Sequence, residues 1–65
     1  MNGLPSWERV ESWPGRRRAD TRRRAILNRA RKRRAEIKTS LIHENGEYVI
    51  YVYGTPEHRK RAIHG

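Results

Sequence analysis

The sequence predicts an α+β protein with a short N-terminal helix, a long basic helix, a two-stranded antiparallel hairpin and a short C-terminal helix. Three observations support this. The arginine-rich stretch 16–38 is dominated by good helix formers and contains no glycine or proline. Asn45-Gly46 lies between two runs of β-branched and aromatic residues, which is typical of a hairpin turn. Thr55-Pro56 is a favourable start for a helix.

A chain of 65 residues without cysteine is one small domain at most, with no disulfide and no thiolate metal site. We divide the domain 1–65 into an aromatic segment 1–15, an arginine-rich helix 16–38, a hairpin 39–54 and a helix or tail 55–65. The three histidines lack a ligand spacing, so we expect no metal and no cofactor. No apolar run approaches the ~20 residues needed to span a bilayer. We therefore expect a cytoplasmic protein without membrane contact, nucleoid-associated in a bacterial or phage setting and nuclear in a eukaryotic host.

The N-terminal segment Leu4–Trp13 is predicted to form the short helix. Trp7, Val10 and Trp13 recur at helical spacing and would lie on one side of it. Pro14-Gly15 then ends the helix as a turn signal. This helix would fix the two indoles against the core or against a partner.

The basic helix is expected from about Thr21 to Lys38, with Asp20 as its N-cap. Ile26, Ala30 and Ile37 fall on one narrow stripe at 100° per residue, and arginines occupy most other angles. Two behaviours are compatible with such a helix. It either lies within nucleic acid with only a thin apolar seam on the protein, or remains partly unfolded until it binds.

The hairpin has its turn at Asn45-Gly46, because both turn positions need positive φ. Leu41, Ile50 and Val52 would share one face and form a core. The like charges of Glu44 and Glu47 leave a longer loop open. Two strands alone are marginal in water, so the hairpin must pack on the basic helix or pair through a free edge, for instance as a homodimer. A two-residue loop would pair Glu44 with Glu47, His43 with Tyr48, Leu41 with Ile50, and Thr39 with Val52.

The charge distribution indicates the ligand. Between Arg16 and Lys38 lie twelve of the sixteen cationic residues, opposed only by Asp20 and Glu36. Such a block is typical of an arm that binds a polyanion. The chain has thirteen arginines and three lysines, and a guanidinium can pair with two oxygens of one phosphate, which favours nucleic acid, with RNA favoured over DNA. The residues expected to contact nucleic acid are Arg16, Arg17, Arg18, Arg22, Arg23, Arg24, Arg29, Arg31, Lys32, Arg33, Arg34 and Lys38.

The aromatic residues are a second candidate set. Tyr51 and Tyr53 lie on one strand face and could stack on exposed bases, although packing against the protein is the more common role of strand tyrosines. Trp7 and Trp13 are further candidates for base stacking, and more often such residues are core or partner anchors.

Residues 19–36 resemble a known pattern. Ala19-Asp20-Thr21-Arg22-Arg23-Arg24, followed by Arg33-Arg34-Ala35-Glu36, is similar to the arginine-rich motif of lambdoid phage antitermination N proteins. In that family a short arginine-rich helix folds on an RNA hairpin, and the rest of the chain contacts RNA polymerase. The resemblance implies an arginine helix in an RNA groove and a role in transcription regulation.

We therefore expect a non-enzymatic phage-type or regulatory factor that binds nucleic acid and a larger protein or ribonucleoprotein complex. One alternative is a regulator that docks on an acidic protein surface. Another is a metal-independent ribonuclease, for which the sequence offers groups but no organising motif. Those groups are His43, Tyr48, Glu57, His58, Lys60 and Arg61.

Overall fold

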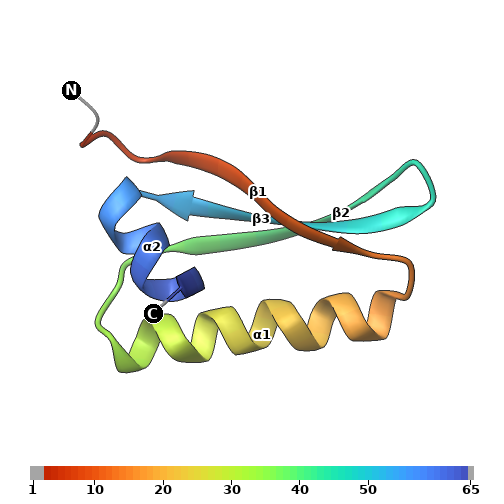
Figure 1. The fold of residues 1–65 in the computed structure, drawn as a ribbon, viewed down its shortest axis with the longest axis horizontal. Helices are drawn as coiled ribbons and strands as arrows, with labels where there is room; N and C mark the ends of the chain where they lie inside the picture. The colour runs from red at the N-terminus through yellow and green to blue at the C-terminus, as the bar shows by residue number, and fades with distance from the viewer. Residues whose placement is uncertain (1–2, 65) are drawn as a thin grey trace.

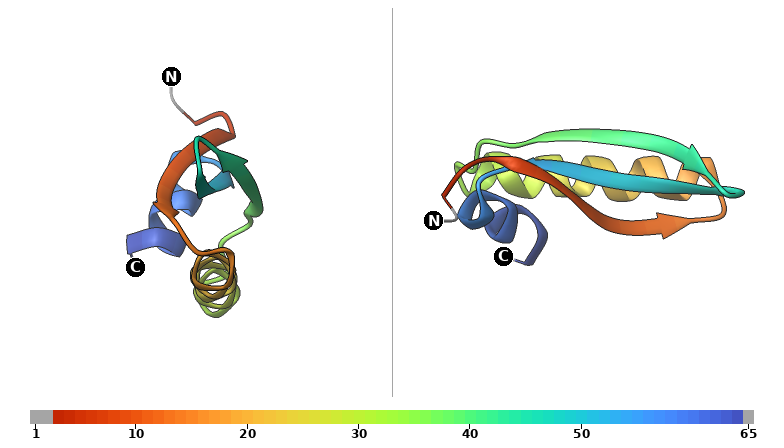
Figure 2. Two further views of the ribbon diagram at one scale, coloured as in Figure 1. Left: turned by 90° about the vertical axis from the view of Figure 1, so that its right-hand side faces the viewer. Right: turned by 90° about the horizontal axis from the view of Figure 1, so that it is seen from above.

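The computed structural model describes residues 3–64, which form a three-stranded antiparallel sheet with both helices on one of its faces (Figure 1). The strand order is β1-β3-β2, so the last strand of the chain is the central one. Figure 2 shows the same two layers from the end and from above. The elements are β1 (Ser6–Trp13), α1 (Arg16–Lys32), β2 (Lys38–Glu44), β3 (Glu47–Gly54) and α2 (Pro56–His64).

The predicted N-terminal helix is wrong: this segment is strand β1, and the hairpin belongs to a three-stranded sheet. β1 pairs with the edge of β3 that β2 leaves free. An isolated two-stranded hairpin is marginal in water, and the N-terminal segment supplies the third strand. The central strand therefore has both edges paired, and the hairpin retains a free edge only along β2.

A β-bulge in β1 accounts for the difference between this strand and the predicted helix. The pairing runs from Arg9 opposite Tyr51 to Glu11 opposite Ile50, so Val10 is an extra residue. A bulge shifts the alternation of side chains by one position. Trp7 consequently lies opposite Tyr53 on one face of the sheet, whereas Trp13 packs on the core at the other. The three residues at helical spacing do not share a side.

The basic helix is confirmed, but both predicted ends are wrong. α1 begins at Arg16 directly after the Pro14-Gly15 turn, and its N-cap Gly15 makes no side-chain cap hydrogen bond. Asp20 is therefore inside the helix and pairs with arginines one turn later. Lys38 belongs to β2.

The helix ends in a left-handed turn at Arg34, whose φ is 55°. The Arg34 N–H donates to the Arg31 carbonyl at 3.3 Å, and the Ala35 N–H donates to the Ala30 carbonyl at 2.8 Å. These two bonds form a Schellman motif, a common way of closing a helix. The chain then returns to the sheet, which is why the helix stops before the stretch of helix-forming residues does.

The hairpin prediction is confirmed with its two-residue loop. Glu44 pairs with Glu47, and the register continues as predicted to Thr39 opposite Val52. Asn45 and Gly46 have φ values of 48° and 79°, as a type I′ turn requires. The C-terminal helix is also confirmed, since the His58 N–H donates to the Thr55 side-chain oxygen at 3.2 Å in an N-cap.

The core joins one narrow face of α1 to the central strand. Ile26 and Ala30 of α1 pack with Ile50 and Val52 of β3, and Ala62 of α2 completes the cluster. Leu41 and Ile37 pack against it as partly buried side chains, as predicted, although Ile37 follows the helix and does not belong to it.

The two sheet faces differ in what covers them. Ile50, Val52 and Leu41 lie on the helix-covered face. The opposite side, which we call the open face, has no helix over it in residues 3–64 (Figures 1 and 2). By alternation along the paired strands it carries Trp7, Arg9, Ser12, Lys38, Ser40, Ile42, Glu44, Glu47, Val49, Tyr51 and Tyr53. Neither helix of the described chain is long and apolar enough to cross a membrane.

The turn after α1 yields a stability prediction. A non-glycine residue in the left-handed region is strained, so Arg34→Gly should raise the free energy of unfolding by about 1 kcal/mol. Arg33→Gly removes the same charge at a residue whose φ is −98°, where glycine brings only flexibility and should destabilise. Urea unfolding followed by circular dichroism measures both, and equal effects of the two substitutions would contradict this account of the turn.

Candidate nucleic-acid interface

The solvent face of α1 is an array of cations. Arg17, Arg24 and Arg31 recur every seven residues and lie on the side of the helix away from Ile26. Successive members are about 10 Å apart along the axis, because each residue rises about 1.5 Å. All three are exposed, and so are most of the other cations of residues 16–34. The exposed cations are Arg16, Arg17, Arg18, Arg24, Arg29, Arg31, Lys32, Arg33 and Arg34.

Arg22 has a structural role. It borders the apolar seam and reaches Glu11 of β1, to which its Nε and Nη2 donate at 3.0 and 3.1 Å. The indole Nε1 of Trp13 donates to the same carboxylate at 2.6 Å. The hydrogen bond from Arg22 lowers the pKa of Glu11 below its ordinary value of 4.5, and the same bond raises the pKa of Arg22. Arg22 therefore joins α1 to β1.

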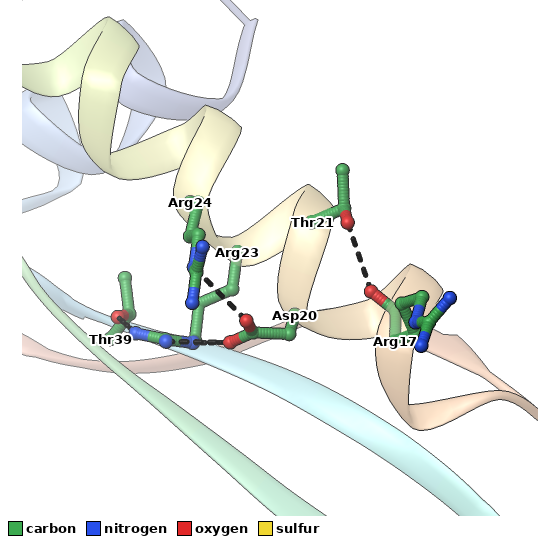
Figure 3. Close-up of polar contacts among 6 residues, drawn as sticks. All are labelled: Arg17, Asp20, Thr21, Arg23, Arg24 and Thr39. Atoms are coloured by element: carbon green, nitrogen blue, oxygen red, sulfur yellow. Dashed lines mark hydrogen bonds and ion pairs between the residues drawn. The ribbon is translucent and has the colours of Figure 1, made fainter.

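Arg23, on the other border of the seam, reaches β2 (Figure 3). Its Nη1 donates to the Thr39 hydroxyl at 3.2 Å, and its Nη2 donates to Asp20 at 2.7 Å. The second oxygen of Asp20 lies 3.0 Å from Arg24 Nε. The hydrogen bond from Arg23 lowers the pKa of Asp20. The single acid of α1 is thus already shared by two arginines and leaves the other cations of the helix without an acidic neighbour on it.

An open groove of about 840 Å³ lies between the N-terminal half of α1 and β2. Four arginines and one acid line it, together with hydroxyl and aromatic groups of the hairpin. The rings of His43 and Tyr48 stack at its hairpin end, with centroids 4.4 Å apart and planes inclined by 10°. The groove residues are Arg16, Arg17, Asp20, Arg23, Arg24, Thr39, Ser40, Leu41, His43 and Tyr48.

The C-terminal half of α1 is tied to α2. Arg29 Nη1 donates to the Ile63 carbonyl at 3.0 Å. Lys60 and Arg61 of α2 line a shallow hollow with Arg33, where Glu57 forms an ion pair with Arg61 at 2.7 Å. The fold thus brings two cations from the end of the chain to the end of α1, although an acid lies beside them.

The remaining predicted residues lie in three places. Arg18 lies on α1 with its guanidinium carbon 5.5 Å from the centroid of the Trp13 ring. Lys38 is on β2, with its ammonium 5.9 Å from the Tyr53 ring, and so does not belong to the helix surface. Trp7, Tyr51 and Tyr53 lie together on the open face, across the sheet from α1.

The groups considered for a ribonuclease do not converge. His43 and Tyr48 lie at the hairpin end, whereas Glu57, His58, Lys60 and Arg61 belong to α2 at the other end of the sheet (Figure 1). The His58 Nδ1 accepts a hydrogen bond from the Glu36 N–H at 3.2 Å. Among residues 3–64, no three His, Asp or Glu side chains cluster as metal ligands would.

Sequence reasoning missed the groups that orient the helix. Glu11 falls within the segment that the sequence predicts to be helical, and the predicted hairpin gives Thr39 only its pairing with Val52. Arg22 and Arg33 border the apolar stripe in the sequence, but the partners of Arg22 and Arg23 lie 11 and 16 residues away. The pairing of such distant residues has no local sequence signal.

The Arg22–Glu11 pair predicts a pH dependence of stability. The pKa of Glu11 is below 4.5 in the folded chain, so its carboxylate stabilises the fold above that pH, and the contribution is lost as the pH falls through the lowered value. Glu11→Gln should reduce the free energy of unfolding by about 1 kcal/mol at pH 7, since both partners remain partly exposed.

The difference between wild type and Glu11→Gln should shrink as the pH falls below about 4.5, as measured by urea unfolding at a series of pH values. Glu57→Gln is the matched control, because the Glu57 side chain is 72% exposed in its pair with Arg61. A difference between wild type and Glu11→Gln that stays constant down to pH 2 would contradict the prediction.

No protein-family model, no curated protein and no solved structure matches this chain. No relative therefore supplies a ligand, or a role for any residue. The geometry and the charge of the chain's own side chains carry the inference of function.

Proposed function

We propose that this chain binds nucleic acid through the solvent face of α1, with RNA preferred over DNA, and that it acts as a small phage-type or regulatory factor in transcription or in a ribonucleoprotein. The single observation that carries the proposal is the array of exposed cations on that face, spaced along the whole helix. An array of this kind is costly for a fold that has no polyanionic ligand, because like charges along one helix repel each other.

The way the arginines are held supports the proposal. Arg22 and Arg23 bind the two edge strands, so they fix the rotation of α1 about its axis. That rotation leaves Arg17 and Arg31 exposed on the side of α1 opposite Ile26, while Arg24, also exposed, pairs with Asp20. A helix that is already folded loses less backbone freedom when its cations meet phosphates than an unfolded arm does.

The support of the sheet also limits how α1 can bind. One side of the helix is buried against β3, so only the opposite side can approach a ligand. Contacts from one side of a helix suit the phosphate backbone, and each phosphate neutralised by an arginine releases counterions. Recognition of phosphate geometry by the planar guanidinium, which can also stack on unpaired bases, favours structured RNA.

The test is the salt dependence of binding to an RNA hairpin, measured by fluorescence anisotropy between about 50 and 200 mM salt. Wild type should show a steep linear fall of the logarithm of the association constant with the logarithm of salt concentration. Arg17→Gln with Arg31→Gln removes two outward cations that have no acidic partner among residues 3–64. This double variant should reduce the slope by about 1.5 and the affinity at 50 mM salt at least roughly tenfold.

The matched control is Lys60→Gln with Arg61→Gln, which removes the same charge from α2 beside Glu57. Its effect on the slope should be less than half that of the α1 double variant, since it lies outside the outward array. Equal effects would mean that net charge alone governs binding. Undetectable binding of wild type at 50 mM salt would overturn the proposed function. If an acidic protein displaces the RNA from the chain, a protein ligand would be favoured instead.

A further inference from the structure

The open face of the sheet carries a row of aromatic rings. The strand register places Trp7 of β1 directly opposite Tyr53 of β3, and Arg9 opposite Tyr51. The two rings of the first pair have centroids 5.2 Å apart and planes inclined by 50°. Trp7 is 51% exposed and Ile42 of β2 is 42% exposed. Exposed apolar side chains that lie together on one face, as Trp7, Ile42 and Tyr51 do, indicate a binding surface.

Two of the rings, those of Trp7 and Tyr51, border a hollow. It has a volume of about 280 Å³ and is lined by Trp7, Ser40, Ile42 and Tyr51. The hydroxyl of Tyr51 donates to Glu44 at 3.0 Å, and this hydrogen bond raises the pKa of the phenol. The ring of Tyr51 is therefore held in place, with its hydroxyl engaged beside the hollow. Flat apolar walls around a shallow space are suited to a planar ring.

The cations and the acids of this face lie in different places. Arg9 on β1 and Lys38 on β2 lie on either side of the tyrosines of β3, with the Lys38 ammonium 5.9 Å from the Tyr53 ring. The acids Glu44 and Glu47 lie on the same face at its hairpin end, where Glu44 accepts the hydrogen bond of the Tyr51 hydroxyl. The face thus offers rings in its middle and cations at both edges, which is the pattern of a site for a ligand that is aromatic and anionic at once.

We propose that the open face binds single-stranded nucleic acid, with bases stacked on Trp7, Tyr51 and Tyr53 and phosphates near Arg9 and Lys38. This inference rests on the proposed function and specifies the ligand as a strand with unpaired bases. Stacking on aromatic side chains of a sheet requires bases that are not paired in a duplex. A duplex can reach the cations of α1 but cannot place its bases on this face.

The positions of the charges on this face argue against a second copy as the occupant. A face-to-face dimer would bring Arg9 and Lys38 of each chain into one interface, with the acids Glu44 and Glu47 confined to the hairpin end of the face. Like charges placed across an interface are unfavourable. A polyanionic strand meets the same cations with the opposite sign.

The proposal is tested with a single-stranded RNA octamer and a blunt RNA duplex of equal charge, by fluorescence anisotropy at one fixed salt concentration. Trp7→Ala and Tyr53→Ala should each weaken octamer binding about tenfold, because a base stacked on a ring contributes about that much. Duplex binding and the salt dependence of octamer binding should stay within twofold of wild type. Leu4→Ala, which removes another exposed apolar side chain outside the aromatic row, is the matched control.

Intrinsic fluorescence gives a readout that does not depend on the stability of the alanine variants. The octamer should quench the emission of wild type, and Trp7→Phe, which leaves Trp13 as the only indole, should lose most of that quenching. Trp7→Phe should also keep more of the affinity than Trp7→Ala, since a ring remains. Circular dichroism establishes that each variant is folded.

The outcomes separate the two proposals. If wild type binds neither octamer nor duplex, the proposed function fails and this inference fails with it. If wild type binds both but Trp7→Ala and Tyr53→Ala bind the octamer as wild type does, only the open-face inference is overturned. It is likewise overturned if sedimentation shows a dimer that Trp7→Ala dissociates while octamer binding is unchanged, because the open face would then be occupied by a second copy.

Discussion

The packing of one narrow seam of α1 on the central strand is the constraint on which the rest of the structure depends. Ile26 and Ala30 of the helix contact Ile50 and Val52 of β3, and Ala19 is buried on the same side. Two of the three helix residues are alanines, so the backbone of α1 can lie close to the sheet. A wider apolar face would leave fewer positions for arginine. The narrowness of the seam is therefore what allows a single helix to be both a core element and a cationic surface.

The two arginines beside the seam convert this packing into a defined orientation. Arg22 is bound to Glu11 on β1 and Arg23 to Thr39 on β2, so α1 is held at both edges of the sheet. Ion pairs that remain partly exposed contribute little to stability, but their geometry fixes which residues face outward. The charge block thus contains two kinds of arginine. Some hold the helix, and the others are available to a ligand.

The sequence predicts those parts of the fold that are determined by residues close together in the chain. The hairpin could be predicted in full, since Asn45-Gly46 determines the turn and the turn determines the register. Strand β1 could not, because its bulge at Val10 breaks the alternation of side chains and its partner strand lies about 40 residues away. The ends of α1 were missed for related reasons. Gly15 caps the helix without a side chain, and Arg34 adopts a left-handed conformation that an arginine in the sequence does not predict.

The candidate site shows the same limit. The clustering of cations was evident from the sequence, and the stripe through Ile26 and Ala30 indicated which side would be buried. The division of the arginines into bound and outward sets required Glu11 and Thr39, which only the tertiary fold brings to α1. The gathering of Trp7 with Tyr53 likewise required a strand pairing that the sequence did not reveal.

The most direct measurement of the central claim is the change in arginine side-chain Nε–Hε resonances when an RNA hairpin is added to the isotopically labelled protein at low salt. The account predicts that Arg17 and Arg31 shift, whereas Arg22 and Arg59, which are bound to Glu11 and Glu8, keep their resonances. Shifts confined to Arg59 and Arg61, with the outward arginines of α1 unchanged, would contradict it.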